Sequence, residues 1–379
     1  MKKLVLSTLS LALFATAGAA HAQNSVTLYG LLDTGLTYAS NSSGHSNIQQ
    51  ASGILNGNRW GLRGSEDLGN GLKAIFTLES GFNLSTGAMG QNSRLFGRQA
   101  FVGLASDQYG SVTLGRQYDN LVDNLGPLSL NGTQYGGTLA SHPYDNDNLN
   151  NSFRVSNSVK YQSVDYAGFK LGAMYGFSNE ADGFSDNRAY SVGASYAFGG
   201  LKVAAAYLQL NGAGSSNTGG AVSTDATFTA SRQRTYGAGV SYAFGPANVG
   251  FVFTQTQLAN ATAIGSTASG KSSGFTLNGT GAHFTNFELN GRYAITPAWS
   301  LSGAYTYTDA SLLGADPKYH QVTLQSDYAL SKRTDVYAEA AYQHVGSTGS
   351  SGITAHIVGV SASSTDSQVV GTVGIRHRF

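Results

Sequence analysis

Alternating apolar and polar positions dominate the chain and give each segment one apolar face. In residues 190–198 every even-numbered position is apolar and the intervening residues are small or polar, and residues 236–244 repeat this pattern closely. A period of two residues is typical of a β-strand whose two sides face different surroundings. Sixteen such segments start near residues 25, 57, 71, 94, 110, 152, 168, 188, 200, 234, 247, 284, 298, 318, 333 and 368. The pattern therefore predicts an all-β fold.

The connections between these predicted strands alternate between short and long. The long ones are rich in Gly, Ser, Asn and Thr, which is typical of solvated loops. Strands of about 9–11 residues, tilted by about 45°, cross a bilayer. Because lipid cannot satisfy free backbone N–H and C=O groups, such a sheet must close on itself. Short turns at one rim, long loops at the other and an even strand number indicate a 16-stranded antiparallel transmembrane β-barrel.

Composition favours this barrel over a soluble β-sandwich or propeller with the same number of strands. Charged residues make up only 11% of the chain, and 50 of its 379 residues are Gly, whereas soluble domains carry about 25% charged residues and about 7% Gly. Small and polar residues on the second strand face suit a water-filled lumen. The absence of Cys excludes disulfide scaffolds and Cys-based metal or nucleophile sites. A net charge of +1 gives no basic bias towards nucleic acid.

The first 22 residues have the pattern of a signal peptide. A basic start at residues 1–3 precedes an apolar stretch over residues 4–20, and Ala-His-Ala at residues 20–22 fits the A-x-A cleavage rule. We expect cleavage after residue 22, which leaves residues 23–379 as the barrel. An uncleaved anchor helix is the alternative. Export of a β-barrel indicates a location in the bacterial outer membrane.

The longest connection, residues 117–151, is unusually apolar for a loop in water. Connections longer than about 12–15 residues without secondary structure are usually functional. A ring of sixteen strands is wide enough for an aqueous channel, so a separate element is needed to narrow it. We therefore predict that this loop, the third long one, folds into the lumen; an outer loop that covers a neighbouring subunit is the alternative. Its apolar residues are Leu121, Val122, Leu125, Leu128, Leu130 and Leu139.

Strand alternation also identifies charged residues on the inner face. Trp60 and Leu62 must face lipid or a partner subunit, so Arg59 and Arg63 face the lumen. The same argument turns further charged residues inward, namely Asp33, Lys73 and Glu79.

Three more arginines lie near the long loop in sequence. Arg98 shares a strand face with Arg94, and Arg154 opens the strand that follows the loop. Arg116 shares a strand face with Val112 and Leu114, which favours a subunit interface for this side chain over the lumen.

Several segments resemble the general diffusion porins of the Gram-negative outer membrane, and most of all those of the β-proteobacterial type. They are residues 26–30, 59–69, 97–104 and 114–119 and the C-terminal strand that ends in Phe379. The resemblance covers the chain after residue 22 and depends on the order and spacing of these segments. It implies a homotrimer of 16-stranded barrels in outer-membrane lipid, each with loop three folded inside as a constriction. It also implies that Phe379 is part of the assembly signal read by the outer-membrane insertion machinery.

The resemblance further implies which residues form the constriction. In the family, a ladder of basic residues on the wall faces acids on the inner loop. By motif position the ladder corresponds to Arg59, Arg98 and Arg154. Gln134 stands where the family has an acid, so Asp119 and Asp123 are the nearest acidic candidates. Three arginines against two aspartates predict a mild anion preference.

The predicted function is a water-filled channel for passive diffusion of ions and small hydrophilic solutes, with no cofactor and no enzyme activity. An outer-membrane barrel enzyme needs a Ser and a His on one outward strand face, with an orienting acid or amide. His320 faces outward alone, and the sequence contains no HExxH motif. The other alternative is a substrate-specific channel, which would need an aromatic track for sugars or a dense basic cluster for phosphate.

Overall fold

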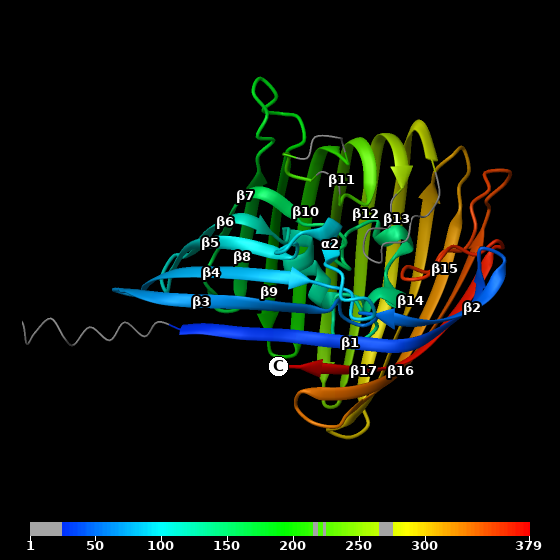
Figure 1. Ribbon diagram of the computed structural model, residues 1–379, viewed down its shortest axis with the longest axis horizontal. Helices are drawn as coiled ribbons and strands as arrows, with labels where there is room; N and C mark the ends of the chain where they lie inside the picture. Colours follow the sequence, from blue (N-terminus) through cyan, green and yellow to red (C-terminus); the bar gives the residue numbers. More distant parts are fainter. Residues whose placement is uncertain (1–24, 215–218, 223–224, 265–275) are drawn as a thin grey trace, which may run out of the picture.

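The computed structural model describes residues 25–214, 219–222, 225–264 and 276–379. The predicted signal peptide, residues 1–22, lies outside these described residues. Among the described residues, no helix is both long and apolar enough to cross a membrane. Seventeen strands in this part of the chain join in one antiparallel sheet that curves into a ring (Figure 1).

From β3 to β17 the strands follow one another around the ring, each paired with its neighbours in sequence, and β1 pairs with β2, β3 and β17. A short helix, α2 (Gly90–Ser93), lies in the connection between β4 and β5. The strand bounds are β1 (Ser25–Ser42), β2 (His45–Ser52), β3 (Arg59–Gly69), β4 (Leu72–Gly81), β5 (Gln99–Ser106), β6 (Gly110–Gln117), β7 (Val155–Gln162), β8 (Phe169–Gly176), β9 (Ala189–Phe198), β10 (Leu201–Ala213), β11 (Phe228–Phe244), β12 (Ala247–Ile264), β13 (Thr276–Ala294), β14 (Trp299–Ser311), β15 (Lys318–Ala329), β16 (Thr334–Gly346) and β17 (Ser367–Arg378).

β2 and β3 together occupy one position in the ring. The first part of β1 pairs with β3 and its second part pairs with β2. Residues 53–58 leave the sheet between these two strands, and the buried carboxylate of Asp33 holds them there. Its Oδ2 accepts hydrogen bonds from the amides of Leu55 (2.8 Å) and Asn56 (2.7 Å). The ring therefore has sixteen positions, and the prediction of a 16-stranded antiparallel barrel is confirmed.

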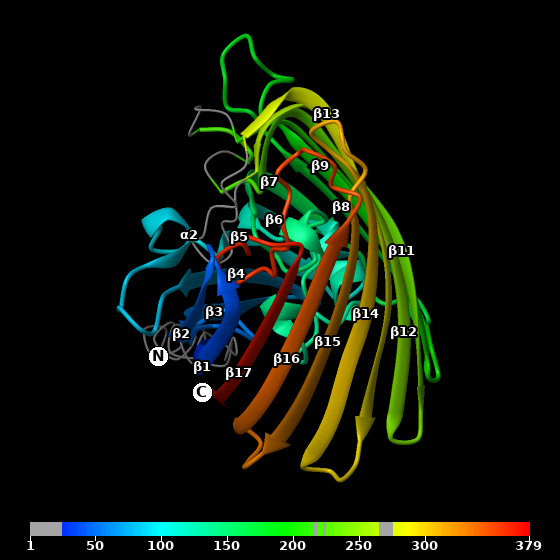
Figure 2. The same ribbon diagram turned by 90° about the vertical axis from the view of Figure 1, so that its right-hand side faces the viewer.

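The ring closes where the last strand meets the first. β17 pairs antiparallel with residues 31–39 of β1, and the two strands lie side by side (Figure 2). At the end of this seam the amide of Gly30 donates to the carbonyl of Phe379 (3.0 Å), and the amide of Phe379 donates back to Gly30 (3.1 Å). A closed ring leaves no strand edge whose backbone groups would face lipid.

The two faces of the sheet have opposite character. On β15, Leu324 is 61% exposed, whereas its neighbours Thr323 and Gln325 are 1% and 3% exposed. The same inversion recurs on the other strands, because large apolar side chains point outward and Thr, Gln, Asn and Ser point inward. The barrel thus presents an apolar outer surface to a bilayer and a polar inner surface to the lumen.

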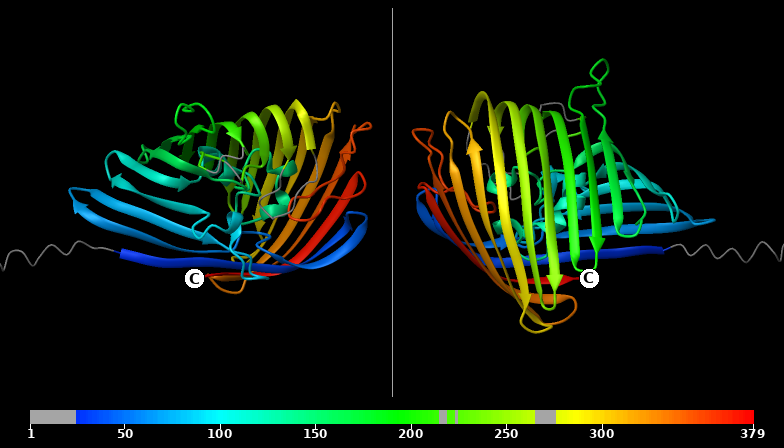
Figure 3. Two further views of the ribbon diagram at one scale, coloured as in Figure 1. Left: turned by 45° about the horizontal axis from the view of Figure 1, so that its top comes forward. Right: turned by 180° about the vertical axis from the view of Figure 1, so that it is seen from behind.

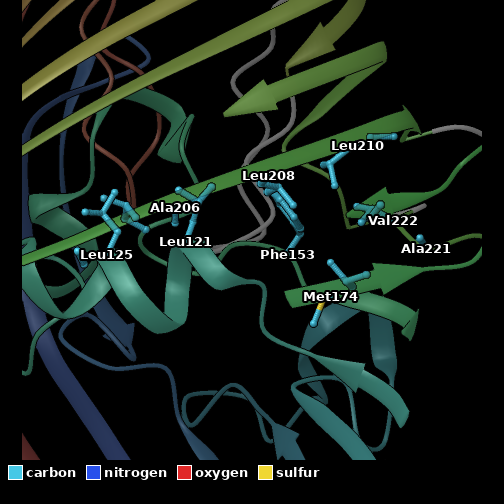
Figure 4. Close-up of a cluster of buried hydrophobic side chains, with 14 of the residues drawn as sticks. Leu121, Leu125, Phe153, Met174, Ala206, Leu208, Leu210, Ala221 and Val222 are labelled. Atoms are coloured by element: carbon cyan, nitrogen blue, oxygen red, sulfur yellow. The ribbon is translucent and has the colours of Figure 1, made fainter. Parts of the chain in front are cut away.

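The long connection after β6 lies inside the ring, as the tilted view shows (Figure 3). This inner loop, residues 118–154, contains a π-helical turn and three 3₁₀ turns: η1 (Leu121–Leu125), η2 (Gly126–Leu128), η3 (Gly137–Ala140) and η4 (Pro143–Asp145). Leu121 and Leu125 are fully buried in one cluster with Ala206 and Leu208 of β10 (Figure 4). The apolar residues of the loop therefore pack on the inner wall of the barrel.

Glycines on the inner wall allow this close packing. A Cβ atom added at Gly193 of β9 would lie 2.6 Å from Nδ2 of Asn124, and one added at Gly237 of β11 would lie 2.8 Å from Cδ2 of Leu125. Real Cβ atoms do not approach other heavy atoms so closely, so a larger residue at either position would push η1 away from the wall.

A buried carboxylate, Glu288 of β13, holds the inner loop on both legs, that is, before and after the tip of the loop at Gln134. It accepts hydrogen bonds from the amide of Leu130 (2.7 Å) and the hydroxyl of Ser129 (2.8 Å) on the outgoing leg. On the returning leg its Oε2 lies 2.9 Å from Nε2 of His142, whose Nδ1 lies 2.6 Å from Oδ2 of Asp147. Burial alone would lower the pKa of His142, but the two carboxylates outweigh burial and raise this pKa to about 10.

This histidine gives the barrel a specific pH dependence of stability. The pKa of His142 in the folded protein is about 10, above the usual value of about 6.5 for an unfolded chain. The stabilisation from protonated His142 is therefore complete below about pH 6.5 and is lost as the pH rises through about 10. We expect the melting-temperature difference between wild type and His142→Asn in detergent to shrink between about pH 6.5 and 10.5. A difference that stays constant over this range would contradict the assignment.

Candidate functional site

A cavity of about 280 Å³ separates the inner loop from one side of the barrel wall. Arg59, Arg98 and Arg154 line it from the wall. They stand at or directly before the first residues of β3, β5 and β7, three strands that run in the same direction around the ring. The loop side is neutral and consists of Tyr118, Val122, Asn131, Gly132, Thr133, Thr138, Leu149, Asn150, Asn151 and Ser152.

Of the three wall arginines, Arg98 forms a direct ion pair, with Glu79 of β4. Nε of Arg98 donates to Oε1 of Glu79 (2.7 Å), and both side chains are more than nine-tenths buried. The hydroxyls of Tyr118 (2.9 Å) and Tyr29 (3.0 Å) donate to the same carboxylate. Three donors thus share the Glu79 charge, which leaves little of its field for a passing ion.

Arg59 and Arg154 have no carboxylate in ion-pair distance within the described part of the chain. The guanidinium of Arg154 lies 5.5 Å from the ring centre of Tyr118, a cation–π contact. Its Nε atom has no hydrogen-bond partner among the described residues. Among the described residues, the wall therefore carries two arginines without a carboxylate in direct ion-pair contact.

The two aspartates of the inner loop that were predicted for the constriction lie elsewhere along the loop. Oδ1 of Asp119 accepts the amide of Leu121 (2.8 Å) and Oδ2 accepts Nδ2 of Asn148 (2.7 Å), and burial raises the pKa of Asp119 to about 6. Asp123 pairs with Lys160 of β7 and lines a separate cavity of about 630 Å³. The structure brings the three arginines together, and neither aspartate is among the residues that line their cavity.

The carboxylate that does line the arginine cavity is Asp225, in the connection between β10 and β11. It forms an ion pair with Nη2 of Arg116 and lies 3.8 Å from Nη1 of Arg94. Sequence reasoning did not find Asp225, because it is 109 residues from Arg116 in the chain.

Arg116 itself lies inside the ring, so its predicted place at a subunit interface is wrong. The register of β6 against β7 shifts between Gly115 and Gln117, and Gly115 adopts a φ of 141°. Such a bulge redirects a side chain to the opposite face. The redirected guanidinium is 8% exposed and donates to the carbonyl of Gly97 (2.8 Å) and the hydroxyl of Ser156 (2.8 Å).

Gln134, at the tip of the inner loop, contacts the opposite wall. Its carbonyl accepts Nη1 of Arg376 (2.7 Å) and its side-chain oxygen accepts Nη2 of Arg378 (3.3 Å). This residue does not line the arginine cavity. The position that resembles an acidic site in the family is thus both neutral and directed towards β17 here.

His320, the histidine weighed for an enzyme, lies on the outer face of β15. Its Nδ1 is 2.7 Å from the hydroxyl of Tyr305, and its ring contacts that of Tyr307. In the described part of the chain, no serine or carboxylate bonds to this ring. The contacts of His320 are those of an aromatic cluster on the outer surface.

Relatives of known sequence agree with this architecture. A sequence profile described as Gram-negative porin matches residues 8–348. An outer membrane porin protein of Bordetella pertussis is 35% identical over 369 residues, which are 90% of this chain and 94% of the relative. The outer membrane porin protein 32 of Delftia acidovorans is 34% identical over 204 residues, 52% of this chain and 56% of the relative.

Solved structures show the same fold. The anion-selective porin from Comamonas acidovorans superimposes with a TM-score of 0.74 at 24% identity, over 94% of this chain and 100% of that one. OmpT of Vibrio cholerae, in a trimer form, gives a TM-score of 0.64 at 20% identity, over 94% and 99%. Together with the closed ring and its polar lumen, these matches establish that the chain belongs to the Gram-negative porin family, whose members form channels for passive diffusion in the outer membrane.

Proposed function

We propose that this porin passes small hydrophilic solutes and ions with a mild preference for anions, which Arg59, Arg98 and Arg154 set at the constriction. The observation that carries the proposal is the shared cavity, with three arginines on the wall and neutral residues on the loop. Solutes move down their own gradients, so the channel requires neither energy input nor a cofactor.

Local charge at the constriction governs the preference, because the chain as a whole is almost neutral. Low-dielectric walls concentrate the field of charges that line a narrow passage, and charged side chains at a constriction set ion selectivity. Asp119 and Asp123 contribute less, since the first is fully buried and the second pairs with Lys160. Glu79 contributes through its pairing with Arg98, which reduces but does not cancel the positive charge of the wall.

Removal of one wall arginine should shift the channel towards cations. We expect Arg154→Gln and Arg98→Ser each to lower the chloride-to-potassium permeability ratio roughly two- to fivefold at about 0.1 M salt. The shift should shrink at about 1 M, where the Debye length falls to about 3 Å. Reversal potentials across a KCl gradient in planar bilayers measure this ratio.

The matched control is Arg333→Gln, which removes the same charge from the exposed turn between β15 and β16. This variant should keep the wild-type ratio. A cation-selective wild type, or an unchanged ratio in Arg98→Ser, would refute the arginine account.

We also propose that the functional unit is a homotrimer in outer-membrane lipid. The outer faces of β1, β5 and β6 expose large apolar residues, namely Val26, Leu28, Val102, Leu104, Val112 and Leu114. The trimer form of OmpT, which shares this fold, supports the same assembly.

Assembly is tested by cross-linking and by the native mass of the detergent-extracted protein, which should correspond to three chains. Leu104→Arg should favour the monomer, because burial of an unpaired charge at a subunit contact is costly. A stable wild-type monomer with full channel activity would contradict the trimer and leave the barrel unaffected.

Phe379 is proposed to act as the assembly signal for the insertion machinery. Deletion of this residue also removes its two hydrogen bonds with Gly30. We expect the deletion to lower the yield of folded barrel in cells, whereas Phe379→Tyr, which keeps the ring and the backbone, should retain it. Heat-modifiable mobility on gels reports the folded fraction. An undiminished folded yield after the deletion would argue against this role.

A further inference from the structure

We propose that Asp225 is a specificity-determining residue whose carboxylate limits the anion preference of the channel by neutralising Arg116 and Arg94 beside the arginine cavity. The inference rests on the proposed arginine constriction and deepens it. It assigns a role in selectivity to a second connection, the one between β10 and β11, beside that of the inner loop.

Residues of this connection are bound to the wall next to the arginines. The carbonyl of Ala221 accepts the amide of Ser156 (2.8 Å), and the carbonyl of Gly219 accepts Nδ2 of Asn157. Ala221 and Val222 are at most 2% exposed and belong to the cluster that contains Phe153 (Figure 4). Residues 219–222 of this connection therefore pack over the start of β7, which directly follows Arg154.

The side chain of Asp225 completes this corner of the lumen. It is 3% exposed, forms an ion pair with Arg116 and lies 3.8 Å from Nη1 of Arg94. Arg116 in turn lies in hydrogen-bond range of the carbonyl of Arg154 (3.3 Å). The Asp225 carboxylate thus interacts with Arg116 and lies near Arg94, and Arg116 is adjacent to Arg154 of the wall.

The charge balance makes Asp225 more influential than the acids on the inner loop. Among the residues that line the arginine cavity in the described part of the chain, Asp225 is the one carboxylate. Asp119 and Asp123 lie outside that lining, and Glu79 is saturated by three donors. Loss of the Asp225 charge would leave the Arg116 guanidinium uncompensated beside the passage, which raises the local positive potential.

The test compares Asp225→Asn with the wild-type channel in a KCl gradient at about 0.1 M. Asparagine keeps the size of the side chain and removes the charge, so the chloride-to-potassium permeability ratio should rise roughly two- to fivefold. Asp225→Glu keeps the charge and should stay near the wild-type ratio. Asp182→Asn removes an exposed aspartate from the connection between β8 and β9 and should leave the ratio unchanged.

A double variant guards against a loss of folding when Arg116 is left unpaired. Arg116→Gln with Asp225→Asn removes both charges of the pair and should return the ratio to near the wild-type value. The uptake rate of a neutral sugar into liposomes should be equal in wild type and Asp225→Asn, since the inference concerns charge and not pore size.

The outcomes separate this inference from the proposed function. An unchanged ratio in Asp225→Asn, or an equal rise in Asp182→Asn, would overturn the role of Asp225 even if the wild type prefers anions. A cation-selective wild type would refute the arginine constriction, while a rise in Asp225→Asn would still support Asp225 as a determinant of selectivity.

Discussion

Backbone hydrogen bonding in lipid is the constraint on which the rest of this structure depends. A strand that crosses a bilayer finds no water, so each of its N–H and C=O groups must pair within the sheet. The chain meets this requirement by pairing β17 with β1, with Phe379 and Gly30 at the end of the seam. Closure divides the side chains between lipid and lumen, and the alternation along each strand follows from that division.

The polar interior then has to be organised, because sixteen strands enclose more space than a selective passage needs. The inner loop fills the side of the lumen formed by β9 to β15, where η1 packs on β10 and Glu288 binds both legs. Removal of one partner from a buried charge network costs about 3–5 kcal/mol, so Glu288 and His142 fix the loop firmly. A cavity remains on the side formed by β3, β5 and β7, and the arginines stand on that side.

The strand pattern of the sequence predicts most of the barrel, because lipid and water impose a strict two-residue period. It misses β2, since His45–Ser52 is mostly polar and lacks a clear apolar face. The inward direction of Arg59 follows from alternation, but that of Arg98 does not, because this residue precedes β5. Family resemblance was needed to place Arg98 and Arg154 in one set.

Two features of the site could not be predicted from local sequence patterns. A bulge at Gly115 redirects Arg116, and bulges leave no reliable trace in hydrophobic periodicity. The contact between Asp225 and Arg116 joins residues far apart in the chain, so only the folded ring brings them together. Both concern the charges beside the passage, which explains why the sequence predicted the channel better than its selectivity.

The central claim is that anions meet the arginine wall as they pass the inner loop. The most direct measurement is anomalous diffraction from crystals of the protein soaked separately in bromide and in caesium salts. The account predicts bromide within hydrogen-bond distance of the Arg59 or Arg154 guanidinium and no caesium in that cavity. Caesium beside these arginines, with bromide absent, would contradict it.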